Sequence, residues 1–196
     1  MNADIIIPTC KKHGTFTELV KQINKTRRTY GATHFTCRNE SAAVNRNFGL
    51  NNTFADLIIM VDDDTGCFQD GWDKKLLMPL WENESIIMTS ARLINEDGSL
   101  AYTMAENYDM ASELVYCNKI PTACVGFRRT HLRFDENFIG SGFEDDDFCR
   151  QMLCEYGHDK YFAIVNGCEI IHYNEAKNQR GKYWEHNKKH FMEKWR

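Results

Sequence analysis

Two long apolar runs stand out in the first third of the chain, and each predicts a buried strand. Residues 4–9 (DIIIPT) form a β-branched run that ends near a proline, and residues 55–64 (ADLIIMVDDD) run directly into three aspartates. Runs that are apolar throughout, without alternation, are typical of strands covered on both faces in a parallel sheet. Further apolar segments predict strands at residues 33–37, 85–93, 122–132, 160–167 and 169–173.

Apolar residues at helical spacing fill most of the segments between these strands. In residues 15–25, Leu19 and Ile23 recur on one face, and Thr15 with Glu18 offers a capping box at the start. Residues 95–99 (NEDGS) predict a turn that leads into a hairpin. Similar spacing predicts helices at residues 40–50, 70–83, 147–157 and 181–195.

This order of elements predicts the fold class. Strands alternate with helices at the front of the chain and hairpins follow, which is typical of an α/β domain. We therefore expect a mostly parallel central sheet flanked by helices, with a small antiparallel part. The 196 residues form one domain, because only three prolines and no Pro/Gly-rich linker interrupt them. In such sheets, ligands bind at the carboxyl ends of the strands.

Composition excludes several function classes. The formal net charge of −4 gives no electrostatic reason to expect nucleic acid or an anionic membrane surface as a partner. No run of about 18 apolar residues predicts a transmembrane helix, and no basic start before an apolar segment predicts a signal peptide. The eight cysteines include no C-x-x-C pair. We therefore expect buried thiols in a reducing, cytoplasmic setting rather than disulfides or a zinc site.

Three aspartates, Asp62, Asp63 and Asp64, come directly after the apolar run that ends at Val61. Carboxylate oxygens at a strand end suit a hard divalent cation such as magnesium or manganese, which also binds diphosphate. The alternative is an acidic turn that caps the following segment. On this segment alone, both interpretations stay open.

A second acidic segment, Glu144 to Asp147, stands where a loop meets a predicted helix and follows the small residues GSG. The helix dipole favours negative side chains there by about 0.3–1 kcal/mol each, which accounts for one or two acids. Four like charges in a row raise one another's pKa and weaken folding. A general base or a polar acceptor pocket needs such crowding, so we interpret this segment as functional.

One histidine, His172, ends the apolar segment EIIHY. A structural histidine at a strand end is the common explanation for such a position. Together with a carboxylate, however, an imidazole makes a manganese site, whereas a set of oxygen ligands alone suits magnesium better. The other histidines show no ligand spacing.

Five motifs follow one another along nearly the whole chain, from Ile5 to Tyr173: IIIPT, AVNRNFGL, IIMVDDDT, GFEDDDFCRQM and IIHYN. Together they resemble the GT-A-fold glycosyltransferases of the family 2 type. The EDDD segment followed by a histidine is most similar to the β-1,4-galactosyltransferases and the polypeptide N-acetylgalactosaminyltransferases. The resemblance implies a single GT-A (Rossmann-like) domain over residues 1–196. It divides into a nucleotide-binding half (1–66), an acceptor and catalytic half (67–173), and a lid with a C-terminal helix (174–196).

The resemblance also implies a role for each matched residue. Asp145 takes the place of the catalytic base, and the metal ligands are Asp64, His172 and Asp62. The acceptor-binding residues are Glu144, Asp146 and Trp72, and Trp72 is equally well explained as a core aromatic residue. The donor-binding residues implied are Pro8, Thr9, Arg38, Arg46, Asp62 and Asp63.

The function implied by the resemblance is inverting, metal-dependent glycosyl transfer. A sugar moves from a nucleotide diphosphate-sugar, with UDP favoured, to an acceptor hydroxyl, and Mn²⁺ or Mg²⁺ is the cofactor. The acceptor class stays open among a glycan, a protein and a modified base in DNA, as does the oligomeric state, and we expect no membrane insertion. Residues 174–184 (NEAKNQRGKYW) are interpreted as a lid over the donor or as a connector to the last helix.

Two alternatives to a glycosyltransferase remain. A sugar-1-phosphate nucleotidyltransferase shares the architecture and metal chemistry, but it needs a glycine-rich basic loop after the first strand, which IIIPTCKKHG lacks. A non-catalytic module that binds a cation or a sugar would use the same acidic loops, and binding without turnover would identify it. The chain is also short for the resembled group, and its loop PTCKKHG departs from the family pattern. These departures leave the acceptor least determined, followed by the donor sugar.

Overall fold

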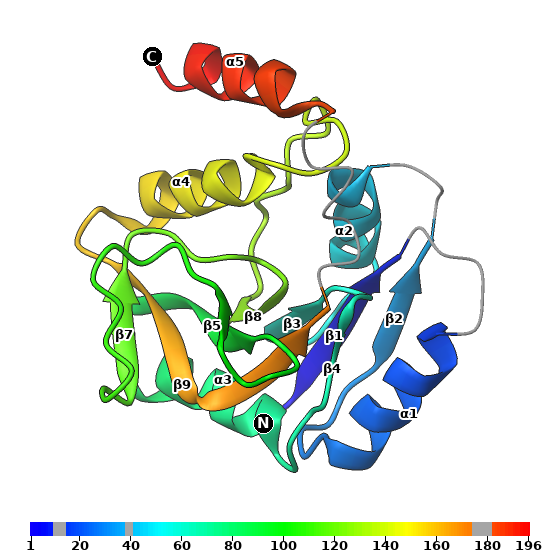
Figure 1. Ribbon diagram of the computed structural model, residues 1–196. Helices are drawn as coiled ribbons and strands as arrows, with labels where there is room; N and C mark the ends of the chain where they lie inside the picture. The colour runs from blue at the N-terminus through cyan, green and yellow to red at the C-terminus, as the bar shows by residue number, and fades with distance from the viewer. Residues whose placement is uncertain (10–14, 38–40, 174–181) are drawn as a thin grey trace.

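The computed structural model describes residues 1–9, 15–37, 41–173 and 182–196. They form one α/β unit around a nine-stranded sheet (Figure 1), in which seven strands follow the order β2-β1-β3-β8-β5-β9-β4, β6 pairs with β5 and β7 pairs with β9. The strands are β1 (Ala3–Pro8), β2 (Thr33–Thr36), β3 (Leu57–Val61), β4 (Thr65–Gly66), β5 (Ile86–Ile94), β6 (Leu100–Tyr102), β7 (Leu114–Cys117), β8 (Cys124–Arg128) and β9 (Tyr161–His172). The helices are α1 (Thr15–Thr26), α2 (Ala42–Asn51), α3 (Trp72–Glu82), α4 (Glu144–Tyr156) and α5 (Trp184–Lys194).

The direction of the strands matches the predicted class. Strand β1 pairs in parallel with β2 and β3, and β5 pairs in parallel with β9. Because β8 is antiparallel to both β3 and β5, those two strands run in the same direction. Strands β1, β2, β3, β5 and β9 are therefore all parallel to one another. Only β8 and the short strands β4, β6 and β7 run in the opposite direction. The expected α/β domain, with a mostly parallel sheet and a smaller antiparallel part, is confirmed.

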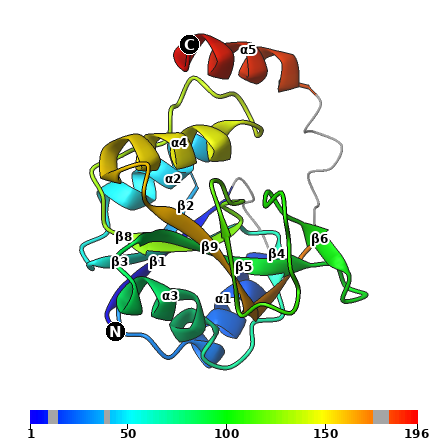
Figure 2. The same cartoon turned by 90° about the vertical axis from the view of Figure 1, so that its left-hand side faces the viewer.

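Helices cover both faces of the sheet, as the continuous apolar runs predicted. Helices α1 and α3 lie against one face and α2 and α4 against the other (Figures 1 and 2). Along β1, Ile5 and Ile7 pack in the cluster that contains the core residues of α1 and α3, whereas Ile6 packs in the cluster of α2 and α4. All three side chains are fully buried. Burial on both faces explains why β1 carries no polar alternation.

Two details of the sheet differ from the sequence prediction. The segments 160–167 and 169–173 are a single strand, β9, whose register against β5 jumps from Val165 to Glu169. At this bulge the Asn166 amide donates hydrogen bonds to the carbonyl oxygens of Asp109 and Ser112, so the unpaired residues are held by a neighbouring loop. Strands β4 and β7 were not predicted because they are only two and four residues long.

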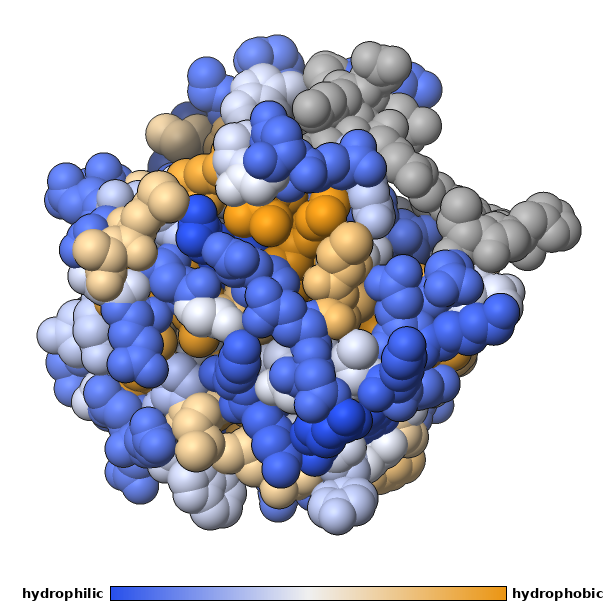
Figure 3. Space-filling view, turned by 60° about the horizontal axis from the view of Figure 1, so that its bottom comes forward, coloured by the Kyte–Doolittle hydropathy of each residue, from blue (hydrophilic) through white to orange (hydrophobic). Residues whose placement is uncertain are grey.

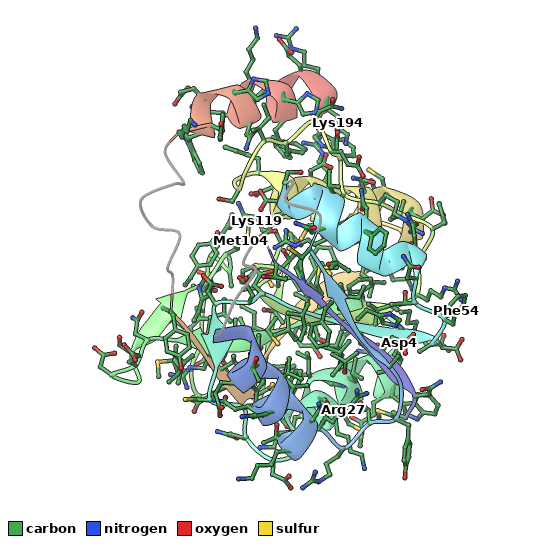
Figure 4. All side chains as sticks on the ribbon, turned by 90° about the vertical axis from the view of Figure 1, so that its right-hand side faces the viewer. Asp4, Arg27, Phe54, Met104, Lys119 and Lys194 are labelled. Carbon is green, nitrogen blue, oxygen red and sulfur yellow. The ribbon has the colours of Figure 1, made fainter. Side chains whose placement is uncertain are left out.

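Helix α5 confirms the predicted C-terminal helix and packs on α4 and on the loop before it (Figures 1 and 2). The Trp195 indole donates a hydrogen bond to Asp147 at 2.7 Å, and Lys194, labelled in Figure 4, pairs with both Asp147 and Asp135. His190 lies 3.0 Å from the Asp135 carboxylate. Charged and polar side chains thus join the end of the chain to the first turn of α4.

This junction predicts a pH-dependent contribution to stability. Burial alone would raise the pKa of Asp135. Hydrogen bonds from Lys194 and His190 lower it by more than burial raises it, so the net pKa lies well below its usual value. A carboxyl with a lowered pKa stabilises the fold above its unfolded-state pKa of about 3.9, and the contribution disappears as the pH falls through the folded-state pKa. We expect Asp135→Asn to lower the free energy of unfolding by about 1–3 kcal/mol at pH 7.

The expected loss shrinks steadily as the pH drops below about 4. Urea unfolding at pH 7 and pH 3 measures both values. Asp56→Asn, which changes an exposed carboxyl, is the matched control and should be nearly neutral at either pH. An equal loss for Asp135→Asn at both pH values would contradict the ion-pair explanation.

Three further features concern the surface, the helices and the cysteines. On the face shown in Figure 3, most of the surface is hydrophilic and the hydrophobic residues gather in small patches. Within the described ranges, no helix is both long and apolar enough to cross a membrane. Of the cysteines described, Cys124, Cys149 and Cys168 are buried as expected, Cys117 is half-buried, and Cys37, Cys67 and Cys154 are exposed.

Candidate active site

A cavity of about 770 Å³ lies at the carboxyl ends of β1 and β3, where sheets of this class bind ligands. It brings together the first acidic segment, His172 and three acids of the second segment, which are far apart in the sequence. The fourth acid, Asp147, faces α5 instead. Of the site residues predicted from the sequence, Pro8, Thr9, Arg46, Asp62, Asp63, Asp64, Glu144, Asp145, Asp146 and His172 all line this cavity.

The other two predicted residues are Trp72 and Arg38. Trp72 is fully buried in the core beneath α3 and packs against the Phe68 ring at 4.7 Å. Its interpretation as a stacking surface for a sugar is therefore wrong, and the core alternative is right. Arg38 and residues 174–181 of the proposed lid lie outside the described residues.

The three aspartates after β3 point to three different partners. Asp62 faces the Arg46 guanidinium at 3.1 Å. Asp63 accepts a hydrogen bond from the Thr9 hydroxyl at 2.6 Å, which joins the ends of β3 and β1. Asp64 lies 3.2 Å from Nε2 of His172. Each aspartate therefore has its own environment.

The short strand β4 is what brings Asp64 to His172. Thr65 pairs with His172 in the antiparallel ladder between β4 and β9. The Asp64 carbonyl oxygen also accepts a hydrogen bond from the Tyr173 backbone at 2.8 Å. A turn of a few residues after β3 thus places a carboxylate beside an imidazole from the last strand.

The Asp64–His172 pair offers one oxygen and one nitrogen atom 3.2 Å apart, which are donor types that Mn²⁺ accepts. Within the part of the chain that the structure describes, the buried Nδ1 of His172 has no hydrogen-bond partner, so that part does not supply the support usual for a ligating histidine. Among the described residues, no group of three or more His, Cys, Asp or Glu side chains could hold a metal ion. The predicted third ligand, Asp62, is turned to Arg46 instead.

Arg46 is the cation that joins the two acidic segments. It is 3% exposed, and its guanidinium lies 3.1 Å from Asp62, 3.3 Å from Asp145 and 3.5 Å from Glu144. Burial lowers the pKa of Arg46, but the three carboxylates raise it to a net value above its usual range. The structure thus shows an internal ion-pair network for a residue predicted to contact the donor.

Burial also shifts the pKa of two carboxylates that line the cavity, Asp62 and Glu144. It raises the pKa of Asp62 to about 6 and that of Glu144 to about 7, although Arg46 opposes the shift in both. Burial likewise raises the pKa of Asp146, against the opposing charge of Lys119. The Lys119 ammonium, labelled in Figure 4, lies 3.2 Å from the Asp146 carboxylate. The site is therefore an acidic cluster in which Arg46 is buried and Lys119 is exposed.

Asp145 is held at the start of α4 by a residue that the sequence analysis missed. The fully buried Thr122 donates to this carboxylate from both its hydroxyl and its backbone N–H, the latter at 3.2 Å. Arg46 donates to the same oxygen as the Thr122 hydroxyl. A carboxylate with its position set in this way can accept a proton from a hydroxyl group bound in the cavity.

The cavity also has aromatic and basic lining, part of which (182–184) belongs to the segment interpreted as a lid over the donor or as a connector. Tyr183 and Trp184 lie at the start of α5, and Phe143 precedes α4. Tyr102 from β6 and Lys182 lie on the same cavity. No periodic pattern marks these residues as a group, because three separate segments bring them together.

Comparisons with known proteins agree with this geometry. A family model described as glycosyl transferase family 2 matches residues 15–144. The structure of GalNAc-T7 with UDP, GalNAc and Mn²⁺ superposes with a TM-score of 0.67 at 12% identity, over 87% of this chain and 43% of that one. A197 from STIV superposes with a TM-score of 0.55 at 14% identity, over 84% and 82%. The chain thus spans less than half of GalNAc-T7. No curated protein sequence matches significantly.

Proposed function

The chain belongs to glycosyl transferase family 2 and has the GT-A fold, and on this basis we propose that it is an inverting, metal-dependent glycosyltransferase. It moves a sugar from a nucleoside diphosphate-sugar to an acceptor hydroxyl. The observation that carries the proposal is the joint lining of one cavity by the Asp64–His172 pair and by Asp145. The proposed cation ligands and the proposed base thus line the same cavity.

The donor half of the cavity lies at the ends of β1 and β3. Asp64 and His172 would hold a Mn²⁺ or Mg²⁺ ion, which supplies positive charge to the diphosphate leaving group. Two protein ligands suffice for such an ion when phosphate oxygens and water fill its other positions. Thr9 and Asp63, joined by their hydrogen bond, border the nucleotide together with Pro8. The presence of UDP and Mn²⁺ in the GalNAc-T7 structure supports a UDP-sugar as donor.

The acceptor half lies at the start of α4. The acceptor hydroxyl gives its proton to the Asp145 carboxylate as its oxygen bonds to the anomeric carbon of the donor sugar. The bond from that carbon to the diphosphate oxygen breaks, and the nucleoside diphosphate leaves with the electron pair. Attack from the face opposite the leaving group inverts the anomeric configuration. Thr122 and Arg46 position Asp145 for this step.

Nucleotide release tests the proposal. A panel of UDP- and GDP-sugars is incubated with the wild type and with Asp64→Ala, with and without Mn²⁺. We expect one sugar nucleotide to be hydrolysed slowly, only with the metal and only by the wild type. A panel in which no sugar nucleotide binds or turns over would remove glycosyl transfer as the function and favour a cation-binding module.

Metal binding gives a second prediction, independent of turnover. Losing the support around a metal ligand typically weakens metal affinity by 10–100-fold, and losing the ligand itself should weaken it at least as much. We expect Asp64→Ala to bind Mn²⁺ at least about tenfold more weakly than the wild type in the presence of UDP. Electron paramagnetic resonance of free Mn²⁺ measures this. Asp97→Ala, an exposed turn residue, is the control, and equal affinities for the two variants would exclude Asp64 as a ligand.

A further inference from the structure

The cavity has an aromatic wall, formed by Phe143, Tyr183 and Trp184. Trp184 is 45% exposed, and its indole packs on the Phe143 ring at a centroid distance of 4.6 Å. A large apolar ring that stays nearly half exposed while it lines an acidic cavity offers a flat surface to a ligand.

The wall is fixed to the loop before α4 by a buried amide. Asn187 on α5 has no exposed surface. Its side chain accepts a hydrogen bond from the Ile139 N–H and donates to the carbonyl oxygens of Ile139 and Gly142, each at 3.0 Å. A buried amide with its hydrogen bonds met in this way sets the position of the helix against the loop.

Two glycines let the aromatic rings lie directly against this loop. Gly140 and Gly142 have φ angles of +67° and +115°. A Cβ atom on Gly140 would lie 3.1 Å from the Tyr183 ring, and one on Gly142 would lie 3.3 Å from the Trp184 indole. The backbone conformation and the close approach both require glycine, so the sequence GSG before the acidic segment has a packing reason.

The wall also keeps a fixed position relative to Asp145. Lys194 and Trp195, at the other end of α5, bond to Asp147 in the first turn of α4. Asp145 belongs to that same turn. Both ends of α5 are therefore tied to the segment that carries the proposed base, and the indole and this carboxylate are parts of one rigid arrangement.

A flat apolar surface beside a row of carboxylates matches the chemistry of a pyranose ring. One face of such a ring presents C–H groups, whose positive edges are attracted to the negative face of an indole. Its hydroxyl groups donate hydrogen bonds to carboxylates such as Asp145 and Asp146. An extended peptide with a serine or threonine side chain has no comparable flat face, so it would leave the indole exposed.

Two of the three wall residues, Tyr183 and Trp184, lie outside the part of the chain that the family model matches. The family match ends at residue 144, whereas Tyr183 and Trp184 come much later. Resting on the proposed function, we infer that the acceptor is a saccharide whose ring stacks on Trp184. This wall, rather than Trp72, then selects the acceptor.

Saccharide binding tests this inference directly. The probes are the methyl glycosides of glucose, galactose and N-acetylglucosamine, together with a peptide that contains serine and threonine. Saturation-transfer NMR in the presence of Mn²⁺ and UDP measures each dissociation constant. We expect a methyl glycoside to bind the wild type. Trp184→Leu should raise its dissociation constant about tenfold, because about 1.4 kcal/mol of stacking energy is lost.

Two further variants separate stacking from general damage. Trp184→Phe keeps an aromatic face and should restore most of the affinity. Trp81→Leu changes a tryptophan that is 71% exposed on α3, on the opposite side of the sheet, and should bind like the wild type. A glycoside affinity equal in Trp184→Leu and Trp81→Leu, or binding of the peptide but of no glycoside, would overturn the inference.

Donor measurements on the same samples distinguish this inference from the proposed function. Binding of Mn²⁺ and UDP with sugar-nucleotide hydrolysis, but without any glycoside binding, overturns the saccharide acceptor and leaves glycosyl transfer standing. Glycoside binding that depends on Trp184, without sugar-nucleotide turnover, supports the saccharide site and overturns glycosyl transfer. If Trp184→Leu weakens the binding of UDP as much as the binding of the glycoside, the aromatic wall is part of the donor site and the inference fails.

Discussion

Replacing Asp145 by asparagine is expected to lower acceptor-stimulated nucleotide release at least a hundredfold. General-base catalysis typically contributes about 10²–10⁴-fold to the rate, and an amide of nearly the same shape cannot take the proton. The donor site at the ends of β1 and β3 is formed by other residues, so the dissociation constant of UDP with Mn²⁺ should change by much less. The loss is therefore expected in kcat rather than in donor affinity.

The matched control for this variant lies on the same helix. Glu155→Gln removes an exposed carboxylate near the other end of α4, where it makes only a 3.7 Å contact with His131. Its transfer rate should equal that of the wild type. If Asp145→Asn retains more than about a tenth of the wild-type rate, a group other than Asp145 takes the proton.

Replacing Arg46 by methionine is expected to have the largest effect on stability. Three carboxylates lie within 3.5 Å of this buried guanidinium. Removing one partner of a buried ion pair typically costs about 3–5 kcal/mol, because the opposite charge stays buried and unpaired. We expect a loss of this size in the free energy of unfolding, measured by urea denaturation at pH 7.

Two control variants test whether the loss of stability comes from the buried ion pairs. Arg46→Lys keeps the charge but not the planar fork that reaches Asp62 and Asp145 together, so an intermediate loss is expected. Arg129→Met changes an exposed arginine whose Cζ atom lies 5.9 Å from the centroid of the Phe54 ring. Its free energy of unfolding should be within about 0.5 kcal/mol of the wild-type value. A loss for Arg46→Met no larger than that for Arg129→Met would mean that the carboxylates find other partners.

Much of the acidic part of the site could be predicted from the sequence, because strand ends and helix starts are visible there. The aspartates after Val61 share one cavity with Glu144, Asp145 and Asp146, whereas Asp147 faces α5. The partners of these acids could not be predicted, because they depend on tertiary contacts. Arg46 and Asp145 are 99 residues apart, and Thr122 and Asp145 are 23 apart. Nothing in the local pattern around Arg46 distinguishes a cation that binds phosphate from one that joins two internal acidic segments.

Trp72 and Trp184 differ in how far the sequence pattern predicts their positions. Trp72, Leu76 and Leu80 are spaced four residues apart on one face of α3, and all three are fully buried. That spacing already predicted a core position for Trp72. Trp184 starts a helix whose pattern is mainly polar, so its place in the cavity follows only from the contacts of Asn187 and Phe143.

The fold was predicted best where apolar runs are long. Strands β1 and β3 and the helices between them follow directly from continuous apolar segments and helical spacing. The sequence predicted two strands, at residues 160–167 and 169–173, where the structure has the single strand β9 with a bulge. Tertiary hydrogen bonds from Asn166 to a loop 54 and 57 residues away keep the strand continuous instead.

The docking of α5 has a consequence for how such a chain diverges. The helix is tied to α4 and its preceding loop mainly through Asn187, His190, Lys194 and Trp195, while its first residue faces the cavity. Substitutions at position 184 can therefore accumulate without disturbing these four attachment points or the acidic cluster. Descendants of one ancestral sequence could exchange one partner molecule for another within a few mutations and still inherit the same chemistry.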